Sequence, residues 1–194
     1  MTTEKRRMIL QRLDIDPSWS LFLDRDGVIN RRLPGDYVRN WDQFEWLPGV
    51  TAALAVFDHV FRRIVVVSNQ QGVGKGLMTV EEVKEIHREM IRAAAMAGGR
   101  IDAVFFAPQL STSGSIMRKP GIGMGLKARR LFPDIRFSKS VMVGDSLSDM
   151  RFGKRLGMTT VLIAPEPHTA RQFPWLIDCF FPYLLTLSHY LSTE

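Results

Sequence analysis

Acidic residues suited to metal binding or nucleophilic attack follow an apolar segment near the start of the chain. Residues 20–23, Ser-Leu-Phe-Leu, carry no charge and lead directly into Asp24, Arg25, Asp26 and Gly27. An apolar run that ends in acids and a glycine is typical of a buried strand leaving a sheet. Because parallel strands end at the crevice where ligands bind, these aspartates are placed to act on a substrate. Two surface turn residues would give the same short pattern, so the motif alone does not decide.

A second pair of acids, Asp145 and Asp149, follows the apolar residues 141–144. Asp24, Asp26 and Asp145 at neighbouring strand ends would crowd three negative charges, which is unfavourable unless a cation neutralises them. Mg²⁺ is the natural cation, since it prefers a few carboxylates together with water and phosphate oxygens. Asp149 has a structural alternative, because Ser146 and Asp149 have the spacing of a helix cap.

A glycine-rich segment with one lysine follows the β-branched residues 64–67. It reads Ser-Asn-Gln-Gln-Gly-Val-Gly-Lys-Gly over residues 68–76. Small residues at a strand exit let backbone N–H groups approach an anion, and Lys75 adds a positive charge. A nucleotide-binding P-loop is excluded, since Asn69 stands where its first glycine belongs and Gly76 where Ser or Thr is required. We therefore expect a phosphate cradle, with a plain glycine-rich loop as the alternative.

A further candidate cation is Lys119, which lies between Arg118 and Pro120. Pro120 disfavours a helix at Lys119, so the lysine should lie on extended chain beside the sheet edge with its ammonium turned inward. There it could neutralise a transferring phosphoryl group, although an Arg-Lys pair is more often solvated surface.

The elements that must position these residues alternate along the chain. Strands are expected over residues 20–23, 62–68, 103–107, 141–144 and 159–164, with a sixth near 178–181, and helices over 50–61, 79–91 and 183–191. Alternation of this kind predicts an α/β fold with a mainly parallel sheet and helices on both faces. Residues 30–46 are polar and aromatic without a sustained period, and we interpret them as a flap over the strand ends. We expect one domain over residues 1–194, with residues 1–19 as an N-terminal extension.

Composition restricts the function further. The 194 residues are 45% hydrophobic, and the net charge of +6 favours an anionic partner such as a phosphorylated metabolite or a nucleic acid. The single cysteine, Cys179, allows no internal disulfide and fits a reducing cytoplasm. Residues 1–20 hold no apolar run typical of a signal peptide, and residues 176–191 are too short and too interrupted to span a membrane. We assign no role to His59, His87, His168 or His189.

Four segments, in order, resemble the motifs of the haloacid dehalogenase (HAD) phosphohydrolase superfamily: Asp24-Arg25-Asp26-Gly27-Val28, Ser68-Asn69, Lys119-Pro120 and Gly144-Asp145-Ser146-Leu147-Ser148-Asp149. The Asn-Gln-x-Gly and Arg-Lys-Pro segments, and the absence of a large cap domain, are similar to the branch with histidinol phosphatase and D-glycero-D-manno-heptose 1,7-bisphosphate phosphatase. Tyr37-Val38, Phe44-Glu45 and Pro48-Gly49-Val50 are more similar to the heptose enzyme. The resemblance implies a three-layer Rossmann-like fold and phosphomonoester hydrolysis.

The resemblance also implies a role for each residue. Asp24 attacks phosphorus and forms an aspartyl-phosphate, while Asp26 protonates the leaving oxygen and later activates water. Ser68 and Lys119 hold the transferring phosphoryl oxygens. Candidates for contact with the rest of the substrate are Asn69, Lys75 and Arg118. Mg²⁺ is held by Asp24, the Asp26 carbonyl and Asp145, with Asp149 nearby.

One departure from that branch concerns a zinc loop, Cys-x-His followed by Cys-x-Cys, that often precedes Arg-Lys-Pro. This chain has Ala107-Pro108-Gln109 and Ser115-Ile116-Met117 at those positions, so thiolate and imidazole ligands are missing. We therefore expect no zinc and a loop ordered by other means.

The expected substrate is a small phosphorylated metabolite, either a heptose bisphosphate or histidinol phosphate, and the expected assembly is a monomer or a weak homo-oligomer. One alternative is a polynucleotide 3′-phosphatase, which the glycine-rich loop and sequence pI of 9.8 would suit. Nucleic acid is the less favoured partner, because no long basic run or aromatic stacking array is present. A second alternative is a phosphate-binding module without catalysis, although such a protein has no need of both a nucleophile and an acid.

Overall fold

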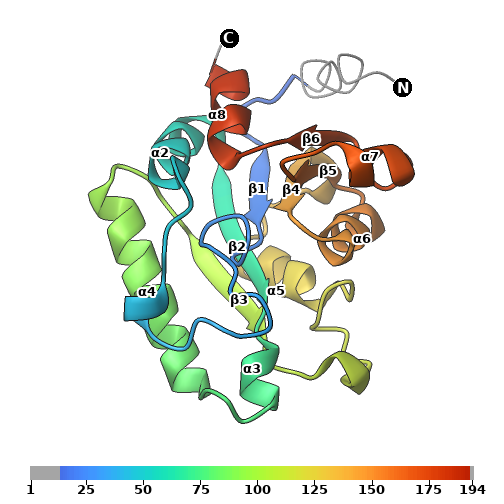
Figure 1. The fold of residues 1–194 in the computed structure, drawn as a ribbon. Helices are drawn as coiled ribbons and strands as arrows, with labels where there is room; N and C mark the ends of the chain where they lie inside the picture. The colour runs from blue at the N-terminus through green and yellow to red at the C-terminus, as the bar shows by residue number, and fades with distance from the viewer. Residues whose placement is uncertain (1–13, 193–194) are drawn as a thin grey trace.

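Six parallel strands form a single sheet in the computed structural model, which describes residues 14–192 (Figure 1). The strands are β1 (Ser20–Leu23), β2 (Arg63–Asn69), β3 (Ala103–Ala107), β4 (Ser140–Gly144), β5 (Thr159–Ile163) and β6 (Cys179–Phe181). Their order across the sheet is β3-β2-β1-β4-β5-β6. Every predicted strand is therefore confirmed, and β1 lies at the centre of the sheet.

Helices follow most of the strands. They are α2 (Val50–Val60), α3 (Gln71–Gly74), α4 (Val80–Met96), α5 (Gly123–Leu131), α6 (Leu147–Leu156), α7 (His168–Gln172) and α8 (Leu184–Ser192). The predicted helices correspond to α2, α4 and α8. Helix α5 was not predicted, because glycines at 123 and 125 have low helix propensity. Packing explains Gly125, since a Cβ there would lie 2.5 Å from Leu156 Cδ1.

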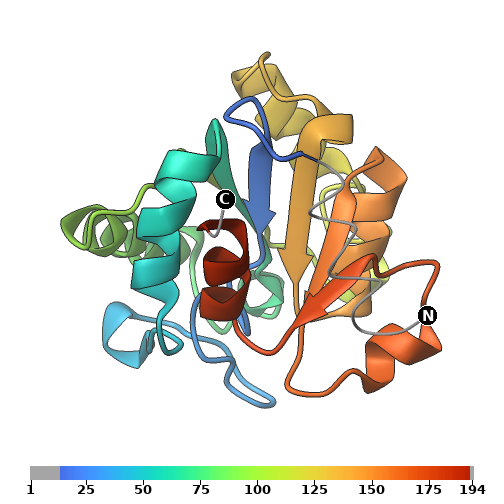
Figure 2. The same cartoon turned by 90° about the horizontal axis from the view of Figure 1, so that it is seen from above.

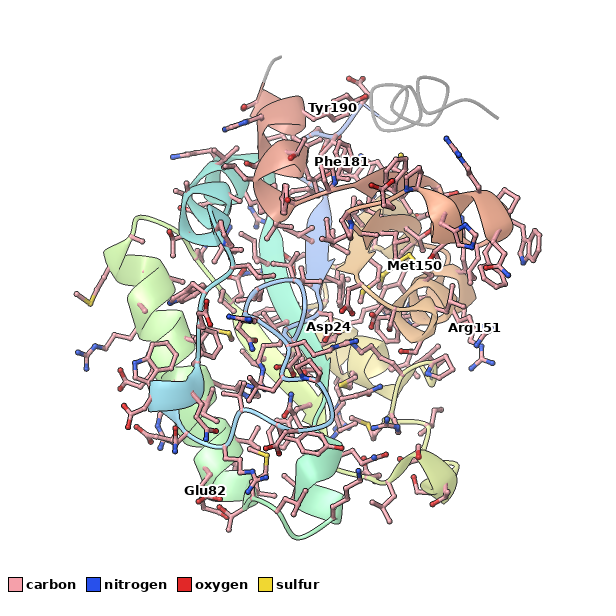
Figure 3. The ribbon with its side chains drawn as sticks, viewed as in Figure 1. Asp24, Glu82, Met150, Arg151, Phe181 and Tyr190 are labelled. Atoms are coloured by element: carbon pink, nitrogen blue, oxygen red, sulfur yellow. The ribbon has the colours of Figure 1, made fainter. Side chains whose placement is uncertain are left out.

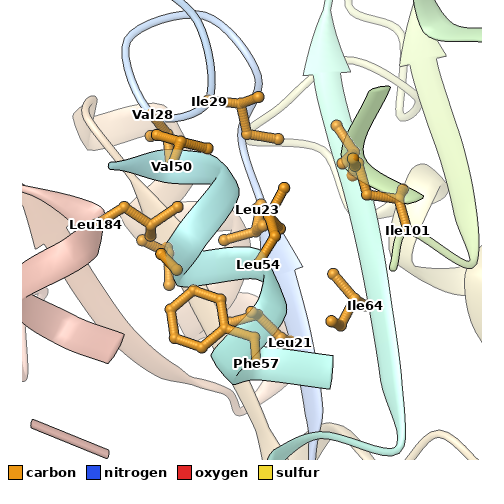
Figure 4. Close-up of a cluster of buried hydrophobic side chains, with 14 of the residues drawn as sticks. Leu21, Leu23, Val28, Ile29, Val50, Leu54, Phe57, Ile64, Ile101 and Leu184 are labelled. Atoms are coloured by element: carbon orange, nitrogen blue, oxygen red, sulfur yellow. The ribbon is translucent and has the colours of Figure 1, made fainter. Parts of the chain in front are cut away.

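The helices cover both faces of the sheet (Figure 2). On one face Leu21 and Leu23 of β1 share a buried cluster with Leu54 and Phe57 of α2 (Figure 4). Phe22, between them, belongs to the cluster on the other face, with residues of α5 and α6. This alternation is the period of a strand buried on both sides. The predicted three-layer α/β fold is therefore confirmed.

Helix α4 begins as its sequence predicts. The Glu82 carboxylate accepts a hydrogen bond from the Thr79 backbone N–H at 2.6 Å, and the Glu82 N–H donates to the Thr79 hydroxyl at 3.1 Å. This capping box satisfies two N–H groups that the helix itself leaves unpaired. The cap orients the buried stripe that includes Val83, Ile86 and His87 toward the sheet.

The segment over residues 30–46 crosses the carboxyl end of β1 and returns through a bridge between Asn30 and Trp46. It contains a short 3-10 turn, η1 (Trp41–Gln43), and the Trp41 and Phe44 rings stack with centroids 4.6 Å apart. This aromatic packing fixes the segment to the core, so its other residues border the strand ends. Closure of this flap on a substrate stays a prediction.

The predicted N-terminal extension, residues 1–19, lies mostly outside the described residues. Two further 3-10 turns, η2 (Ser111–Ser113) and η3 (Phe137–Lys139), complete the elements. Within residues 14–192, none of the helices has the length and apolar character needed to cross a membrane.

Truncation of Leu54 should strongly destabilise the fold, because its side chain is fully buried between α2 and the sheet. Leu54→Ala should lower the free energy of unfolding by about 2–5 kcal/mol, measured by urea denaturation. Leu126→Ala is the matched control, since Leu126 is 40% exposed, and should cost much less. Equal losses in the two variants would contradict this assignment of the core.

Candidate active site

The sheet register brings the ends of three strands together. Leu23 of β1 pairs with Val66 of β2 on one side and with Val143 of β4 on the other. The Asp24 N–H continues this pairing and donates to the Val143 carbonyl at 2.9 Å. Residues that follow these strands therefore emerge at one edge, and Figure 3 shows Asp24 in the interior near the middle of the molecule.

Three carboxylates meet at this edge. Asp24, Asp145 and Asp149 each offer an oxygen, and these oxygens lie within 4.8 Å of one another. Burial, together with the nearby Asp149 charge, raises the pKa of Asp24 to about 7, although Lys119 opposes the rise. Burial likewise raises the pKa of Asp145 to about 6. Clustered oxygen ligands that resist ionising without a cation fit Mg²⁺.

The Asp26 backbone carbonyl lies beside the same cluster. One guanidinium nitrogen of Arg32 donates to that carbonyl at 3.2 Å and to Asp145 Oδ1 at 2.9 Å, so the two oxygens share a neighbour. The Asp26 side chain has other partners. If Asp26 contributes to a metal site, it does so through its carbonyl oxygen, as the resemblance implies.

The Lys119 ammonium is buried among the acids. Its Nζ lies 2.8 Å from Asp24 Oδ1 and 2.6 Å from Asp149 Oδ1, and it donates to the Val67 carbonyl at 2.6 Å. Burial alone would lower the pKa of Lys119, but the charges of Asp149 and Asp24 outweigh burial and raise it. The predicted inward position of Lys119 is confirmed.

Asp149 both caps helix α6 and belongs to the acidic cluster, which are the two roles that the sequence allowed. Its Oδ2 accepts hydrogen bonds from the Ser146 N–H at 3.1 Å and from the Ser146 hydroxyl at 2.6 Å, which completes the capping box of α6. Its Oδ1 faces Lys119. The helix cap therefore fixes one oxygen of Asp149 while the other remains in the acidic cluster.

The Asp26 carboxylate is enclosed by three donor side chains that the sequence did not identify. Oδ1 accepts from Arg25 at 2.9 Å and Asn30 at 3.0 Å, and Oδ2 accepts from Arg25 at 3.0 Å and Gln70 at 2.8 Å. Burial alone would raise the pKa of Asp26, but the Arg25 charge and these hydrogen bonds lower it. Asp26 is thus held as a carboxylate, the form that can accept a proton from water.

His87 of α4 supports this enclosure from behind. Its Nε2 lies 3.2 Å from Arg25 Nη1, and an arginine can only donate, so His87 is neutral and accepts. Burial and the Arg25 charge lower the pKa of His87 to about 3. No sequence signal links these two residues, which lie 62 positions apart.

A cavity of about 420 Å³ opens beside Asp24 and Asp26, lined also by Ser68, Lys75 and Arg118. Within the segment that we expected to form a phosphate cradle, with a plain glycine-rich loop as the alternative, the chain forms the short helix α3, with Lys75 as its C-cap. The Lys75 ammonium lies 5.4 Å from the centre of the Tyr37 ring. A role for these groups in binding an anion stays a prediction.

Asn69 has a different position from the other predicted binding residues. Its amide oxygen accepts from the Lys119 N–H at 2.9 Å, and its amide nitrogen donates to the Lys119 carbonyl at 3.1 Å. Asn69 therefore holds the backbone that presents Lys119, and its contact with a substrate stays a prediction.

Hydrogen bonds hold the loop over residues 108–117, the segment for which the resemblance led us to expect order without zinc. Gln71 Oε1 accepts from the Ser111 N–H at 2.7 Å, and the Gly74 N–H donates to the Pro108 carbonyl at 3.0 Å. Ser115 Oγ accepts from the Met117 N–H at 3.2 Å. Helix α3 thus supports this loop, beside which a second cavity of about 550 Å³ is lined by Arg118 and Arg155.

Comparison with known proteins gives a consistent result. A family model described as HAD-hydrolase-like matches residues 116–174. A D-glycero-α-D-manno-heptose-1,7-bisphosphate 7-phosphatase of Mycobacterium bovis is 50% identical over 132 residues, which cover 68% of this chain and 70% of that protein. The D-glycero-β-D-manno-heptose-1,7-bisphosphate 7-phosphatase of Rhodopseudomonas palustris is 34% identical over 71% of this chain and 78% of its own length.

Solved structures agree with these relatives. The D,D-heptose 1,7-bisphosphate phosphatase from B. bronchiseptica, complexed with magnesium and phosphate, superposes with a TM-score of 0.79 at 30% identity. The match covers 89% of this chain and 97% of that one. L-2-haloacid dehalogenase from Xanthobacter autotrophicus, at 10% identity and a TM-score of 0.58, shares the fold.

The close approach of Asp145 to Gly27 generates a prediction. A Cβ at Gly27 would lie 2.0 Å from Asp145 Oδ2, so Gly27→Ala should displace that carboxylate. We expect Mg²⁺ affinity, measured by isothermal titration calorimetry, to fall at least about tenfold. Gly35→Ala is the control, because Gly35 also has positive φ but no atom within 4 Å of the added Cβ. Equal Mg²⁺ affinity in both variants would argue against Asp145 as a ligand.

Proposed function

We propose that this chain, which belongs to the haloacid dehalogenase (HAD) superfamily of phosphatases and to its heptose 1,7-bisphosphate 7-phosphatase branch, removes the C7 phosphate of D-glycero-α-D-manno-heptose 1,7-bisphosphate. The observation that carries this proposal is a buried carboxylate, Asp24, held by Lys119 within an acidic cluster and adjacent to a cavity. Relatives at 49–50% identity are named for the α-anomer and those near 34% for the β-anomer, which favours the α substrate.

In the first step, an Asp24 carboxylate oxygen attacks phosphorus and the bond from phosphorus to the sugar C7 oxygen breaks. The departing oxygen takes a proton from the Asp26 carboxyl group, and an aspartyl-phosphate forms on Asp24. Ser68 and Lys119 are the proposed partners of the phosphoryl oxygens, because both side chains are buried beside Asp24 at the cavity. Preorganised donors of this kind stabilise charge that develops during transfer.

In the second step, water attacks phosphorus and the bond to Asp24 breaks. Asp26 accepts the proton that water loses, so inorganic phosphate leaves and Asp26 is again protonated for the next cycle. Bound Mg²⁺, held by Asp24, Asp145 and the Asp26 carbonyl, with Asp149 nearby, would neutralise the carboxylates and the phosphate. The low pKa of Asp26 in the observed arrangement suits this second step, in which it acts as a base. For the first step, the negative charge of a bound phosphate would raise that pKa and favour the protonated form.

The second phosphate of such a substrate needs cations of its own. Lys75 and Arg118 line the cavity beside Asp24, and neither side chain forms an ion pair with a carboxylate among the described residues. Burial lowers the pKa of Arg118, so a phosphate partner would relieve the cost of its desolvation. We assign Lys75 and Arg118 to the phosphate that is not transferred.

A substrate panel tests the reaction. Phosphate release in Mg²⁺ should be fastest with the α-anomer of heptose 1,7-bisphosphate, slower with the β-anomer and with histidinol phosphate, and abolished by EDTA. Asp24→Asn should lower kcat more than about 10³-fold while remaining folded by circular dichroism. An Asp24→Asn variant as active as the wild type would refute the aspartyl-phosphate mechanism, and histidinol phosphate as the best substrate would refute the heptose assignment.

The assignment of the second phosphate predicts a selective effect on KM. Lys75→Met and Arg118→Met should each raise KM for heptose bisphosphate about tenfold, the value of a charge-assisted hydrogen bond, and should affect p-nitrophenyl phosphate less. Lys127→Met, an exposed change of the same charge, is the control and should leave both KM values alone. If KM rises equally for the two substrates, Lys75 and Arg118 do not bind the second phosphate.

A further inference from the structure

Two buried amides beside Asp26 each leave one oxygen without a partner. Asn30 and Gln70 are fully buried and direct their amide nitrogens at the Asp26 carboxylate. Neither Asn30 Oδ1 nor Gln70 Oε1 has a hydrogen-bond partner within residues 14–192. Turning either amide would place its oxygen against a carboxylate oxygen, so the observed orientation is the favourable one.

An unpartnered buried oxygen is costly, and apolar side chains of the same size would avoid the cost. The chain instead carries two such oxygens at one carboxylate, in addition to Arg25, which is itself fully buried. Because both oxygens and the buried Arg25 surround the same carboxylate, we attribute this free-energy cost to a functional requirement of Asp26 and not to packing of the core.

Arg25 also restricts the rotation of the Asp26 carboxylate. Two of its guanidinium nitrogens lie within hydrogen-bond distance of Asp26 Oδ1, and the third donates to His87. The His87 ring in turn contacts Phe106 of β3 edge-on, with centroids 5.5 Å apart. The guanidinium is therefore fixed by α4 and β3, and it cannot rotate away from Asp26 without breaking these contacts.

Gln70 also links Asp26 to Ser68. Its amide nitrogen donates to Asp26 Oδ2 and to Ser68 Oγ, at 2.8 Å in each case. Because the Ser68 oxygen accepts from Gln70, the Ser68 hydroxyl hydrogen remains free to donate into the cavity that Ser68 lines. One amide thus sets the relative orientation of the proton-transfer group and a phosphoryl-binding hydroxyl.

We propose that Asn30 and Gln70, together with Arg25, are positioning residues that aim the Asp26 carboxylate at the water that hydrolyses the aspartyl-phosphate. This proposal rests on the mechanism proposed above. In the step concerned, the water oxygen bonds to phosphorus, the bond from phosphorus to Asp24 breaks, and the water proton passes to Asp26. A carboxylate free to rotate would spend less time in line with that water, and the hydrolysis step would slow.

The test uses Asn30→Leu and Gln70→Met, which keep side-chain size and remove the amide. The substrate is p-nitrophenyl phosphate, whose phenolate leaves without a proton, so formation of the aspartyl-phosphate does not require Asp26. We expect kcat to fall about tenfold in each variant, and in Asn30→Leu KM should fall with it, so that kcat/KM changes less than about twofold. Gln70→Met also releases Ser68, so its kcat/KM should fall too, but by a smaller factor than kcat. Rapid mixing should show a burst of p-nitrophenolate close to one equivalent per enzyme.

Urea unfolding of the same variants, compared with a variant at a buried hydroxyl that lies outside the cavity, separates a positioning role from a loss of stability. The two amide variants should unfold at urea concentrations close to that of the wild type, because each removes an unpartnered oxygen along with its hydrogen bonds. Thr160→Val deletes an equally buried hydroxyl that lies 2.8 Å from the Leu176 carbonyl oxygen and 3.0 Å from Asp178 Oδ2, and Thr160 does not line the cavity beside Asp24. It should unfold at lower urea and retain the wild-type kcat.

Each remaining outcome has a defined meaning. An unchanged kcat, or kcat and kcat/KM falling by the same factor, overturns the positioning role of the amide concerned, and a loss of folding in one variant leaves the other to decide. Asp26→Asn separates this proposal from the mechanism, since it should show the same split at about 10²–10⁴-fold. If Asp26→Asn shows no split, the proposed role of Asp26 fails; if only the amide variants lack it, the positioning role fails.

Discussion

The position of the acidic cluster depends on the compensation of buried charge by Lys119. Removing two carboxylates from water costs several kcal/mol for each, and their mutual repulsion adds to that cost. The Lys119 ammonium contacts both Asp24 and Asp149 and also the Val67 carbonyl, so its positive charge compensates both carboxylates at the edge of the sheet. Asn69 fixes the Lys119 backbone through both ends of its amide. Asn69 therefore fixes the backbone of the lysine whose positive charge compensates Asp24.

Two aspartates one residue apart acquire opposite character from their surroundings. Asp24 faces other carboxylates, and its pKa is raised to about 7, whereas Asp26 faces a guanidinium and two amides, and its pKa is lowered. Separation of this kind is how one site assigns different tasks to chemically identical groups. The intervening residue accounts for part of it, because Arg25 carries its charge to the Asp26 side of the turn.

Sequence could predict the strands and the motif residues because both depend on local pattern. β-branched runs identify buried strands, and acids or Lys-Pro after them identify the functional edge. Helix α5 escaped prediction because Gly125 is explained only by contact with Leu156, a tertiary effect. The side chains that enclose the Asp26 carboxylate could not be predicted either, because tertiary contacts bring them together. Arg25, Asn30 and Gln70 lie inside or beside the motifs but have ordinary residue types, and His87 meets Arg25 only after α4 packs.

The central place of β1 has a consequence for the growing chain. Asp24 leaves the ribosome well before its partners in the acidic cluster, because Asp145 after β4 and Asp149 of α6 are made more than 100 residues later. Domains fold as units, and such distant pairings form late. Until Asp149 has been synthesised, the acids remain apart in water, where each is ionised at little cost. The nascent protein therefore carries no assembled acidic cluster until β4 has paired with β1 and α6 has been made.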